Sequence, residues 1–143
     1  MAVLDTSAVV AFLTGEPGGP RVLDILQRPV PSYLCAVNLA EVIDVLGRRT
    51  RDVDRVERQV DLMLHGGLDV VAADETLGRV AGQLRADFYR RRSRDISLGD
   101  CFALATAMRV GGPLVTSDRF LSDVARLDGT DVELIADSSG TIR

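Results

Sequence analysis

The chain has 143 residues and a mass of 15.4 kDa, a length that predicts one domain over residues 1–143. With 46% hydrophobic and 27% charged residues, it has the composition of a soluble globular protein, and its apolar runs are too short to cross a bilayer. A net charge of −4, two cysteines and one histidine exclude a broadly basic nucleic-acid-binding protein, a disulfide-stabilised scaffold and a zinc site of the Cys/His type.

The first half of the chain alternates short apolar runs with helical patterns. The predicted elements are a strand over 2–4, a helix that ends at Gly15, a helix over 20–27, a strand over 32–35, and helices over 37–49 and 52–65. Thr6 or Ser7 is the expected N-cap of the first helix, because a hydroxyl there can accept a free backbone N–H.

The second half repeats the alternation. The predicted elements are a strand over 68–72, a helix over 75–91, a helix from Ser97 to Gly111, a strand over 113–116, a helix over 119–127 and a strand over 132–136. We expect Phe102, Ala105 and Met108 on the core side of the helix capped by Ser97, and a frayed tail from Asp137. Strands that alternate with helices predict an α/β fold, with a mainly parallel five-stranded sheet flanked by helices on both faces.

Acidic residues stand where predicted strands end or where apolar helices begin. Asp5, Asp74 and Asp118 follow three of the strands, whereas Glu41 and Asp100 lie near the starts of apolar helices. Such sheets bind ligands at the carboxyl ends of their strands, so acids there would face one site. Each acid alone is also explained as a surface group stabilised by a helix dipole. We assign Asp74 to the N-cap of the helix that follows it.

Four carboxylates at one site need a neutralising partner. Two charges about 4 Å apart interact by roughly 4 kcal/mol at an effective dielectric constant near 20, so protons or cations must compensate. Because these positions offer only carboxylates and hydroxyls, Mg²⁺ or Mn²⁺ fits better than zinc. Such ions activate water and stabilise the charge that develops on phosphorus.

Four motifs occur in order along the chain: VLDTSA at 3–8, AVNLAEV at 36–42, ISLGDC at 96–101 and LVTSDRF at 114–120. Together they resemble the motifs of PIN-domain ribonucleases, the toxin components of VapBC-type toxin–antitoxin pairs, over nearly the whole chain. The resemblance implies a Rossmann-like PIN fold and Mg²⁺- or Mn²⁺-dependent cleavage of RNA, such as tRNA or ribosomal RNA, by a metal-activated water.

The resemblance also implies roles for four acids, because Asp5, Glu41, Asp100 and Asp118 fall on the acidic positions of the family. Asp5 and Asp100 would bind the principal metal ion, and Glu41 would share it or act through water. Asp118 would hold a second ion or orient the attacking water.

Two hydroxyls lie near these acids. Thr6 and Thr116 would hydrogen-bond the carboxylates or a metal-bound water, and helix capping is an equal alternative for Thr6. Two positions depart from the family pattern: Asn38 stands where Ser or Thr is usual, and Cys101 where Ala is commoner. Neither departure removes a carboxylate.

Further charged residues are candidates for the rim of the site. Arg90, Arg91 and Arg92 would contact RNA phosphates if they border the acids, and a solvated helix end is the alternative. Asp44 is a rim candidate, and Asp95 either reaches the rim or caps the helix that follows it.

Other classes of protein fit the sequence less well. A phospho-accepting receiver domain needs a lysine, and all seventeen basic residues here are arginine. A haloacid-dehalogenase-type phosphatase needs Asp-x-Asp at the first strand, where this chain has Asp5 followed by Thr6 and Ser7. A metal-free ribonuclease usually uses histidines as general acid and base. The remaining alternative is a catalytically silent PIN scaffold that binds RNA or protein.

The resemblance finally implies partners. Toxins of this type form homodimers, and heterotetramers or larger complexes with an antitoxin whose tail fills a groove and blocks the acids. The stretches 20–27 and 52–65 are rich in aliphatic residues that either line such a groove or belong to the core. Because no basic segment precedes an apolar core near Met1, we expect a cytoplasmic protein rather than a secreted or membrane-bound one.

Overall fold

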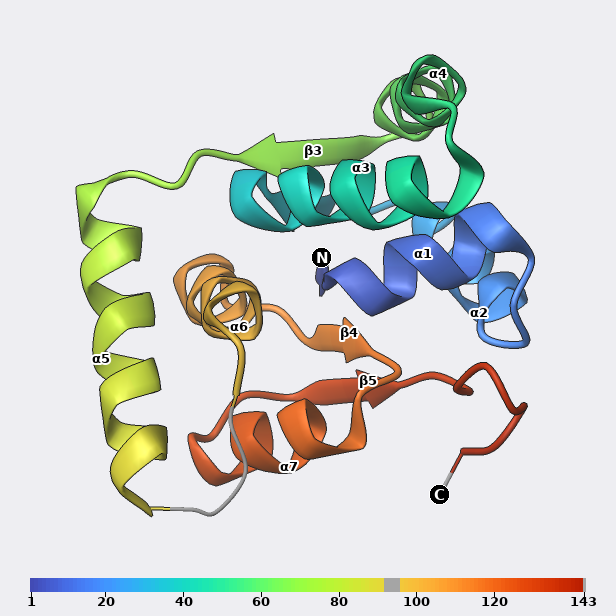
Figure 1. Ribbon diagram of the computed structural model, residues 1–143. Coiled ribbons are helices and arrows are strands. Elements are labelled where there is room, and N and C mark those ends of the chain that lie inside the picture. The colour runs from blue at the N-terminus through green and yellow to red at the C-terminus, as the bar shows by residue number, and fades with distance from the viewer. Residues whose placement is uncertain (92–95, 143) are drawn as a thin grey trace.

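The computed structural model describes residues 1–91 and 96–142, with the backbone alone at 89–91, and places five strands of this part of the chain in one sheet (Figure 1). The strands are β1 (Ala2–Leu4), β2 (Ser32–Cys35), β3 (Leu68–Val71), β4 (Leu114–Thr116) and β5 (Val132–Leu134). All neighbours pair in parallel in the order β3-β2-β1-β4-β5, which confirms the predicted parallel sheet.

The chain reverses its direction across the sheet beside β1. From β1 it moves outward to β2 and β3, and it then returns to place β4 on the other side of β1, with Val3 opposite Leu114. A crevice forms beyond the carboxyl ends of two strands where the order reverses, and ligands bind there in sheets of this kind. Asp5 follows β1 and Asp118 lies two residues beyond β4, so the topology brings these two acids to the crevice.

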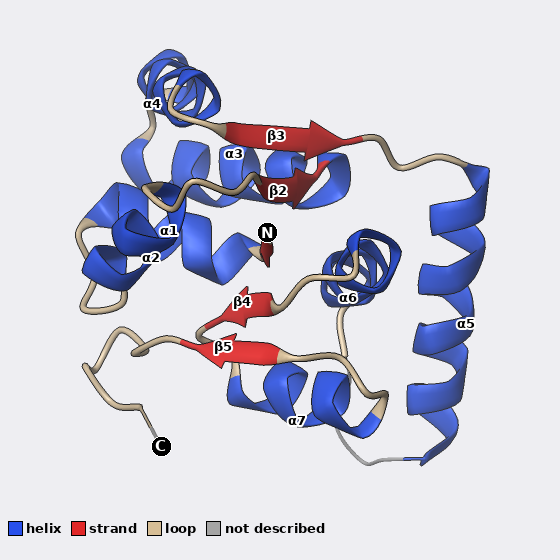
Figure 2. Cartoon of the chain, turned by 180° about the vertical axis from the view of Figure 1, so that it is seen from behind, coloured by secondary structure: helices blue, strands red, loops and turns tan. Residues whose placement is uncertain are grey.

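Helices cover both faces of the sheet in the described residues, as predicted (Figures 1 and 2). They are α1 (Thr6–Thr14), α2 (Gly19–Leu26), α3 (Ala36–Thr50), α4 (Val53–His65), α5 (Glu75–Arg91), α6 (Leu98–Val110) and α7 (Arg119–Leu127). Leu4 of β1 belongs to the core formed with α1 to α4, and the preceding Val3 belongs to the core formed with α5 to α7. Among the described helices, none is long and apolar enough to cross a membrane.

The N-cap of α1 is Asp5, and the prediction of Thr6 or Ser7 was wrong. Asp5 keeps the extended backbone of the strand, with φ −86° and ψ 179°, and its Oδ1 accepts a hydrogen bond from the N–H of Ala8 at 2.8 Å. The helix therefore begins one residue earlier than a hydroxyl cap would allow, because the carboxylate that ends the strand also satisfies a free N–H of the first turn.

Helix α6 differs from its predicted orientation at one residue. Ala105 is buried and Phe102 packs against the core, as expected, but Met108 is 45% exposed. The helix lies beside α5 and the sheet and is buried on several sides, including Ala103 and Leu104. Its sequence is apolar almost all round, so spacing alone did not show which residue would face solvent.

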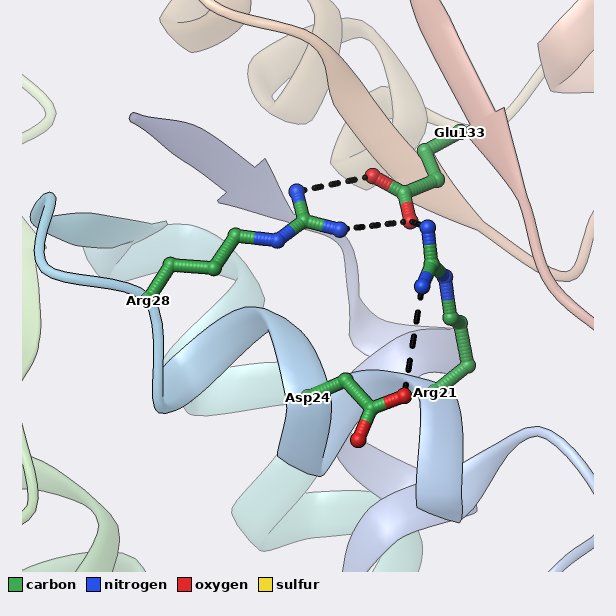
Figure 3. A network of polar contacts seen from close by, with 4 residues as sticks. All are labelled: Arg21, Asp24, Arg28 and Glu133. Carbon is green, nitrogen blue, oxygen red and sulfur yellow. Dashed lines mark hydrogen bonds and ion pairs between the residues drawn. The ribbon is translucent and has the colours of Figure 1, made fainter.

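A network of four charged residues links α2 to β5 on the surface (Figure 3). The guanidinium of Arg28, just after α2, donates to both carboxylate oxygens of Glu133 at 3.1 Å. Arg21 pairs with the same carboxylate at 2.5 Å and with Asp24 at 3.9 Å. Because Glu133 is shared by two arginines and its side chain is only 20% exposed, the network restrains α2 more firmly than an isolated surface pair would.

Candidate active site

The four acids predicted from the motifs line one pocket at the carboxyl edge of the sheet. Its volume is about 430 Å³. The lining residues come from α1, α3 and α6 and from the N-caps of α1 and α7: Asp5, Thr6, Ser7, Val10, Glu41, Asp44, Val45, Arg48, Asp100 and Asp118. The structure thus brings together residues that are more than one hundred positions apart in the sequence.

Asp5 is the most enclosed of the four carboxylates, at 2% exposure. Its Oδ1 accepts hydrogen bonds from the Ala8 N–H at 2.8 Å and the Ser7 hydroxyl at 2.7 Å, and its Oδ2 accepts one from the Thr116 hydroxyl at 2.6 Å. The pKa of Asp5 is raised to about 6, mainly because the carboxylate is buried and to a smaller extent because of the charge of Asp100. The three hydrogen bonds act in the opposite direction and lower the pKa. Asp5 is therefore mostly ionised at pH 7, although it is buried.

Glu41 is held between two helices. Its Oε2 accepts hydrogen bonds from the Thr6 hydroxyl at 2.6 Å and from the amide of Asn38 at 3.2 Å. Its carboxylate lies directly against Gly99 of α6, where any Cβ would overlap it. The glycine of the ISLGDC motif thus provides the space that the Glu41 carboxylate occupies, next to Asp100.

Asp100 is fixed by a reciprocal capping arrangement at the start of α6. Its Oδ2 accepts from the Ser97 N–H at 2.9 Å, and the Ser97 hydroxyl accepts from the Asp100 N–H at 3.0 Å. This confirms the predicted cap at Ser97. Partial burial raises the pKa of Asp100, and the neighbouring charges of Asp118 and Glu41 raise it further.

Asp118 is the N-cap of α7. Its Oδ1 accepts from the N–H groups of Phe120 at 2.7 Å and Leu121 at 3.1 Å, while its own N–H donates to the Thr116 hydroxyl at 2.9 Å. Thr116 is fully buried and donates in turn to Asp5, so one hydroxyl connects two of the four acids. The prediction that Thr6 and Thr116 hydrogen-bond the carboxylates agrees with this geometry.

Three of the four carboxylates accept hydrogen bonds through one oxygen alone, whereas both oxygens of Asp5 accept them. Within the described ranges, Oε1 of Glu41, Oδ1 of Asp100 and Oδ2 of Asp118 accept no hydrogen bond, and Oδ2 of Asp5 accepts one. All four side chains are therefore fixed in orientation, and Glu41, Asp100 and Asp118 each keep an oxygen without a hydrogen bond. No three acidic, cysteine or histidine side chains in residues 1–91 and 96–142 are grouped closely enough to enclose an ion by themselves.

Both cysteines, Cys35 and Cys101, are buried free thiols. Burial raises the pKa of Cys101 to about 11, and the adjacent charge of Asp100 raises it as well. Cys101 is therefore a neutral packing residue beside the site at physiological pH and not a nucleophile.

The remaining charged candidates have different outcomes. Asp44 lies on the pocket wall, where it forms an exposed ion pair with Arg48 at 2.7 Å. Asp74 caps α5 through the Leu77 N–H at 2.9 Å, and Arg109 lowers its pKa by a bidentate ion pair, so its assignment as a cap is confirmed.

The structure does not test the predictions made for three arginines and one aspartate. Arg92 and Asp95 lie outside the described residues, as do the side chains of Arg90 and Arg91. Their predicted contacts with RNA phosphates or with the rim stay predictions.

Three residues of the site had no predicted role there. Ser7 donates to Asp5 and accepts from the backbone N–H of Ser117, Asn38 donates to Glu41, and Arg48 lines the pocket. The spacing of Asn38 three residues before Glu41 was a usable signal, because residues three apart share a helix face. Local spacing was also a signal for the other two, because Ser7 follows Asp5 by two residues and Arg48 lies four residues after Asp44 on α3.

The strand order and the acidic pocket define a class of protein, and comparison with known families identifies it. The model of the PIN domain family matches residues 2–127. This chain belongs to the PIN domain family.

Relatives within the family are VapC ribonucleases. Ribonuclease VapC42 of Mycobacterium tuberculosis is 34% identical over 116 residues, which cover 79% of this chain and 87% of the relative. Ribonuclease VapC of Mycolicibacterium smegmatis is 33% identical over 128 residues, which cover 86% and 97%.

Solved structures share the fold. VapBC2 of Rickettsia felis, bound to a DNA fragment from its promoter, superposes with a TM-score of 0.72 at 17% identity and covers 94% of this chain and 98% of that one. VapC20 of Mycobacterium tuberculosis, a toxin that cleaves the sarcin–ricin loop, superposes with a TM-score of 0.64 at 18% identity, over 86% and 94%. At these identities the superpositions establish the fold, which agrees with the predicted PIN-like sheet.

Proposed function

We propose that this PIN-domain protein is the toxin of a VapBC-type pair, an endoribonuclease that cleaves RNA with the help of a divalent cation and is inhibited by a cognate antitoxin. The observation that carries the proposal is the pocket lined by four carboxylates that hydrogen bonds hold in place, three of which keep one oxygen without a hydrogen bond among the described residues. Relatives at 33–34% identity are ribonucleases, which supports the same activity. We place its action in the cytoplasm, where RNA substrates are available.

The donor set fits a hard cation. The pocket offers carboxylate and hydroxyl oxygens, which Mg²⁺ and Mn²⁺ prefer. Mg²⁺ usually keeps several water ligands and uses one or two carboxylates, so the loose grouping of the acids is compatible with it. Asp5 and Asp100 would hold the principal ion, Glu41 would share it, and Asp118 would hold a second one or orient the attacking water. When bound, the cation would activate a water and stabilise the negative charge at the scissile phosphate.

The side chains of the pocket prepare this chemistry. Hydrogen bonds from Thr116 and Ser7 favour the ionised form of Asp5, although burial opposes it. Asp118, whose side chain is oriented by the N-terminus of α7, would orient the attacking water if it does not hold a second ion. We include Arg90, Arg91 and Arg92 as contacts for RNA phosphates, which would position RNA without reading its sequence.

A second cavity is our candidate for the antitoxin site. It has a volume of about 410 Å³ and lies between α1, α2 and α4. Its lining is Phe12, Leu13, Leu23, Leu26, Gln27, Gln59, Leu62, Met63 and Gly66. Leu62 is 73% exposed and Leu23 is 41% exposed, so this wall presents apolar surface to solvent. These residues lie in the aliphatic stretches 20–27 and 52–65 and on α1.

We propose that an apolar segment of the antitoxin occupies this groove and that a basic side chain beyond it pairs with the acids. Helix α1 contributes to both cavities, with Val10 in the acidic pocket and Phe12 in the groove. One peptide that follows α1 would therefore reach from the groove to the carboxylates. We further propose a homodimeric toxin that forms a heterotetramer or a larger complex with the antitoxin.

Cleavage of purified RNA tests the activity. Total RNA, tRNA and a sarcin–ricin loop oligonucleotide are incubated with antitoxin-free protein in Mg²⁺, Mn²⁺ or EDTA, beside Asp5→Asn and Asp100→Asn, with folding checked by circular dichroism. We expect metal-dependent cutting that both substitutions abolish. Cutting that persists in EDTA or in both variants would refute the carboxylate mechanism. If folded protein binds RNA but never cuts it, the chain is a catalytically silent PIN scaffold.

A further inference from the structure

The side chain of Asn38 connects three of the four acidic motifs. It lies in the first turn of α3, is 1% exposed, and donates from Nδ2 toward three oxygens. The acceptors are the Thr6 hydroxyl and Glu41 Oε2, both at 3.2 Å, and the Gly99 carbonyl at 3.1 Å. These partners belong to α1, α3 and α6, so one amide meets the starts of three helices at the acidic pocket.

The other end of this amide has no partner among the described residues. Oδ1 of Asn38 is buried without a hydrogen bond. Exchanging the two ends of the amide would place Oδ1 against the Glu41 carboxylate and the Gly99 carbonyl, where like partial charges repel, so the three acceptors determine the orientation. An unpaired buried oxygen is costly, and an apolar side chain of similar size would avoid that cost. The residue is therefore explained by its donor and not by general packing.

The donor acts on one oxygen of Glu41. Oε2 receives both the Asn38 amide and the Thr6 hydroxyl, and Thr6 itself accepts from Asn38. Gly99 lies against the same carboxylate, because a Cβ at this position would overlap both of its oxygens and its carboxyl carbon. With Oε2 held in this way, the carboxylate has one orientation, and Oε1 is the oxygen left for a ligand.

We propose that Asn38 is a positioning residue for Glu41: it holds Oε2, so that Oε1 is the oxygen available to a cation. This inference rests on the proposed metal-dependent function. It gives a positioning role to Asn38, at a position where the family usually has Ser or Thr. Asn38 acts through Glu41 and does not touch the cation.

Direct Mn²⁺ binding tests the inference without relying on cleavage. The Mn²⁺ affinity of metal-stripped protein is measured by electron paramagnetic resonance for wild type, Asn38→Leu, Glu41→Gln and the double variant. We expect Asn38→Leu to weaken binding by about 10- to 100-fold, the usual effect of removing a group that orients a metal ligand. In the Glu41→Gln background the same substitution should cause no further loss, because the residue it orients is already altered.

Three additional variants complete the experiment. Asn38→Ser restores a hydroxyl donor and should recover part of the Mn²⁺ affinity. If Asn38→Leu does not fold, Asn38→Ala replaces it in the comparison of single and double variants with Glu41→Gln. Ser122→Ala is the matched control, because Ser122 is also fully buried, its hydroxyl also has no partner in the described residues, and it lies on α7 away from Glu41. Its Mn²⁺ affinity should equal that of wild type.

The outcomes separate this inference from the function on which it rests. Wild-type affinity in Asn38→Leu, or an equal loss in both backgrounds, would overturn the positioning role. If the wild type binds Mn²⁺, and Asn38→Leu weakens binding only when Glu41 is intact, the role of Asn38 is supported. If the same protein cuts no RNA, the ribonuclease proposal is refuted. Absence of Mn²⁺ binding in wild type would overturn both.

Discussion

The acidic pocket and the apolar groove lie on either side of α1, and they are built in opposite ways. The pocket is lined by five acidic side chains, and four of them are anchored by hydrogen bonds from helix starts, hydroxyls and an amide. The lining of the groove contains no titratable side chain, and its surface is mostly aliphatic. The pocket is therefore defined by orientation and charge, whereas the groove is defined by shape and apolar area.

Because of this difference, the functions of the two regions should be sensitive to different perturbations. Replacing one oxygen of an anchored carboxylate by an NH₂ group should abolish ligand binding there, because the ligand requires an oxygen at that position. An apolar surface responds roughly in proportion to the area that is lost. Charge, pH and metal ions should thus act on the pocket, and substitutions that change apolar area should act on the groove.

The largest effect should follow from neutralising an acid in the pocket. Asp5→Asn or Asp100→Asn should lower kcat/KM for RNA cleavage by about 1,000-fold or more, a size common for the loss of a charged catalytic group. The measurement is cleavage of the best substrate at saturating Mg²⁺. Both variants should still bind the antitoxin groove peptide, which tests the independence of the two regions. A loss of less than about tenfold in both variants would contradict the assigned roles.

The second prediction concerns pH and the buried Asp5. Its pKa is raised from 3.8 to about 6 in the folded protein, so the native state binds more protons than the unfolded state between these values. The stability that comes from the protonated form is present below pH 4 and is lost as the pH rises through 6, a change on the order of 3 kcal/mol at most. Urea titrations of metal-free protein at pH 5 and 7.5 measure about half of this change, the part that is lost between these two pH values.

Asp5→Asn is the control for this titration. The amide carries no charge, so we expect the variant to lose less stability than wild type between pH 5 and 7.5. The oxygen of the amide still accepts from Ala8 and Ser7, and its NH₂ can donate to Thr116, which makes folding of the variant plausible on hydrogen-bonding grounds. Identical pH profiles for the two proteins would show that Asp5 titrates near its ordinary value.

A third prediction uses the close contact between two motifs. Gly99→Ala places a Cβ where the Glu41 carboxylate lies, so we expect cleavage to fall by about 10- to 100-fold, as for a displaced metal ligand. Gly78→Ala is the matched control, because a Cβ at that helical glycine of α5 meets nothing within 4 Å and should stabilise the helix by about 1 kcal/mol. Equal activity of the two variants would contradict the placement of Glu41 against α6.

The smallest of these effects belongs to the groove. Leu62→Glu puts a charge on an exposed wall of the groove and should raise the antitoxin concentration for half-inhibition by about tenfold or more, the loss expected when one buried leucine contact is removed. Leu127→Glu, at a leucine that is 65% exposed at the end of α7, is the control. Each variant is compared with its own uninhibited cleavage rate. Unchanged inhibition of the Leu62 variant would place the antitoxin elsewhere.

The alternation of strands and helices, the parallel sheet and four of the acids that line the pocket could be predicted from the sequence alone. These features are local or periodic: strand-ending aspartates, apolar runs and motif order are readable without knowing what packs against what. The caps at Asp74 and Ser97 were predictable for the same reason, because a cap acts within three residues.

The hydrogen bonds that orient the acids could be found only from the tertiary structure. That Asp5 rather than Thr6 caps α1 depends on where the strand stops, and that Thr116 joins Asp5 to Asp118 depends on β1 and β4 being neighbours. The amide of Asn38 and the space at Gly99 acquire meaning only when α1, α3 and α6 meet. A hydrogen bond or an overlap between residues far apart in the chain depends on distances of a few tenths of an ångström, and those distances are set by the packing of the whole domain.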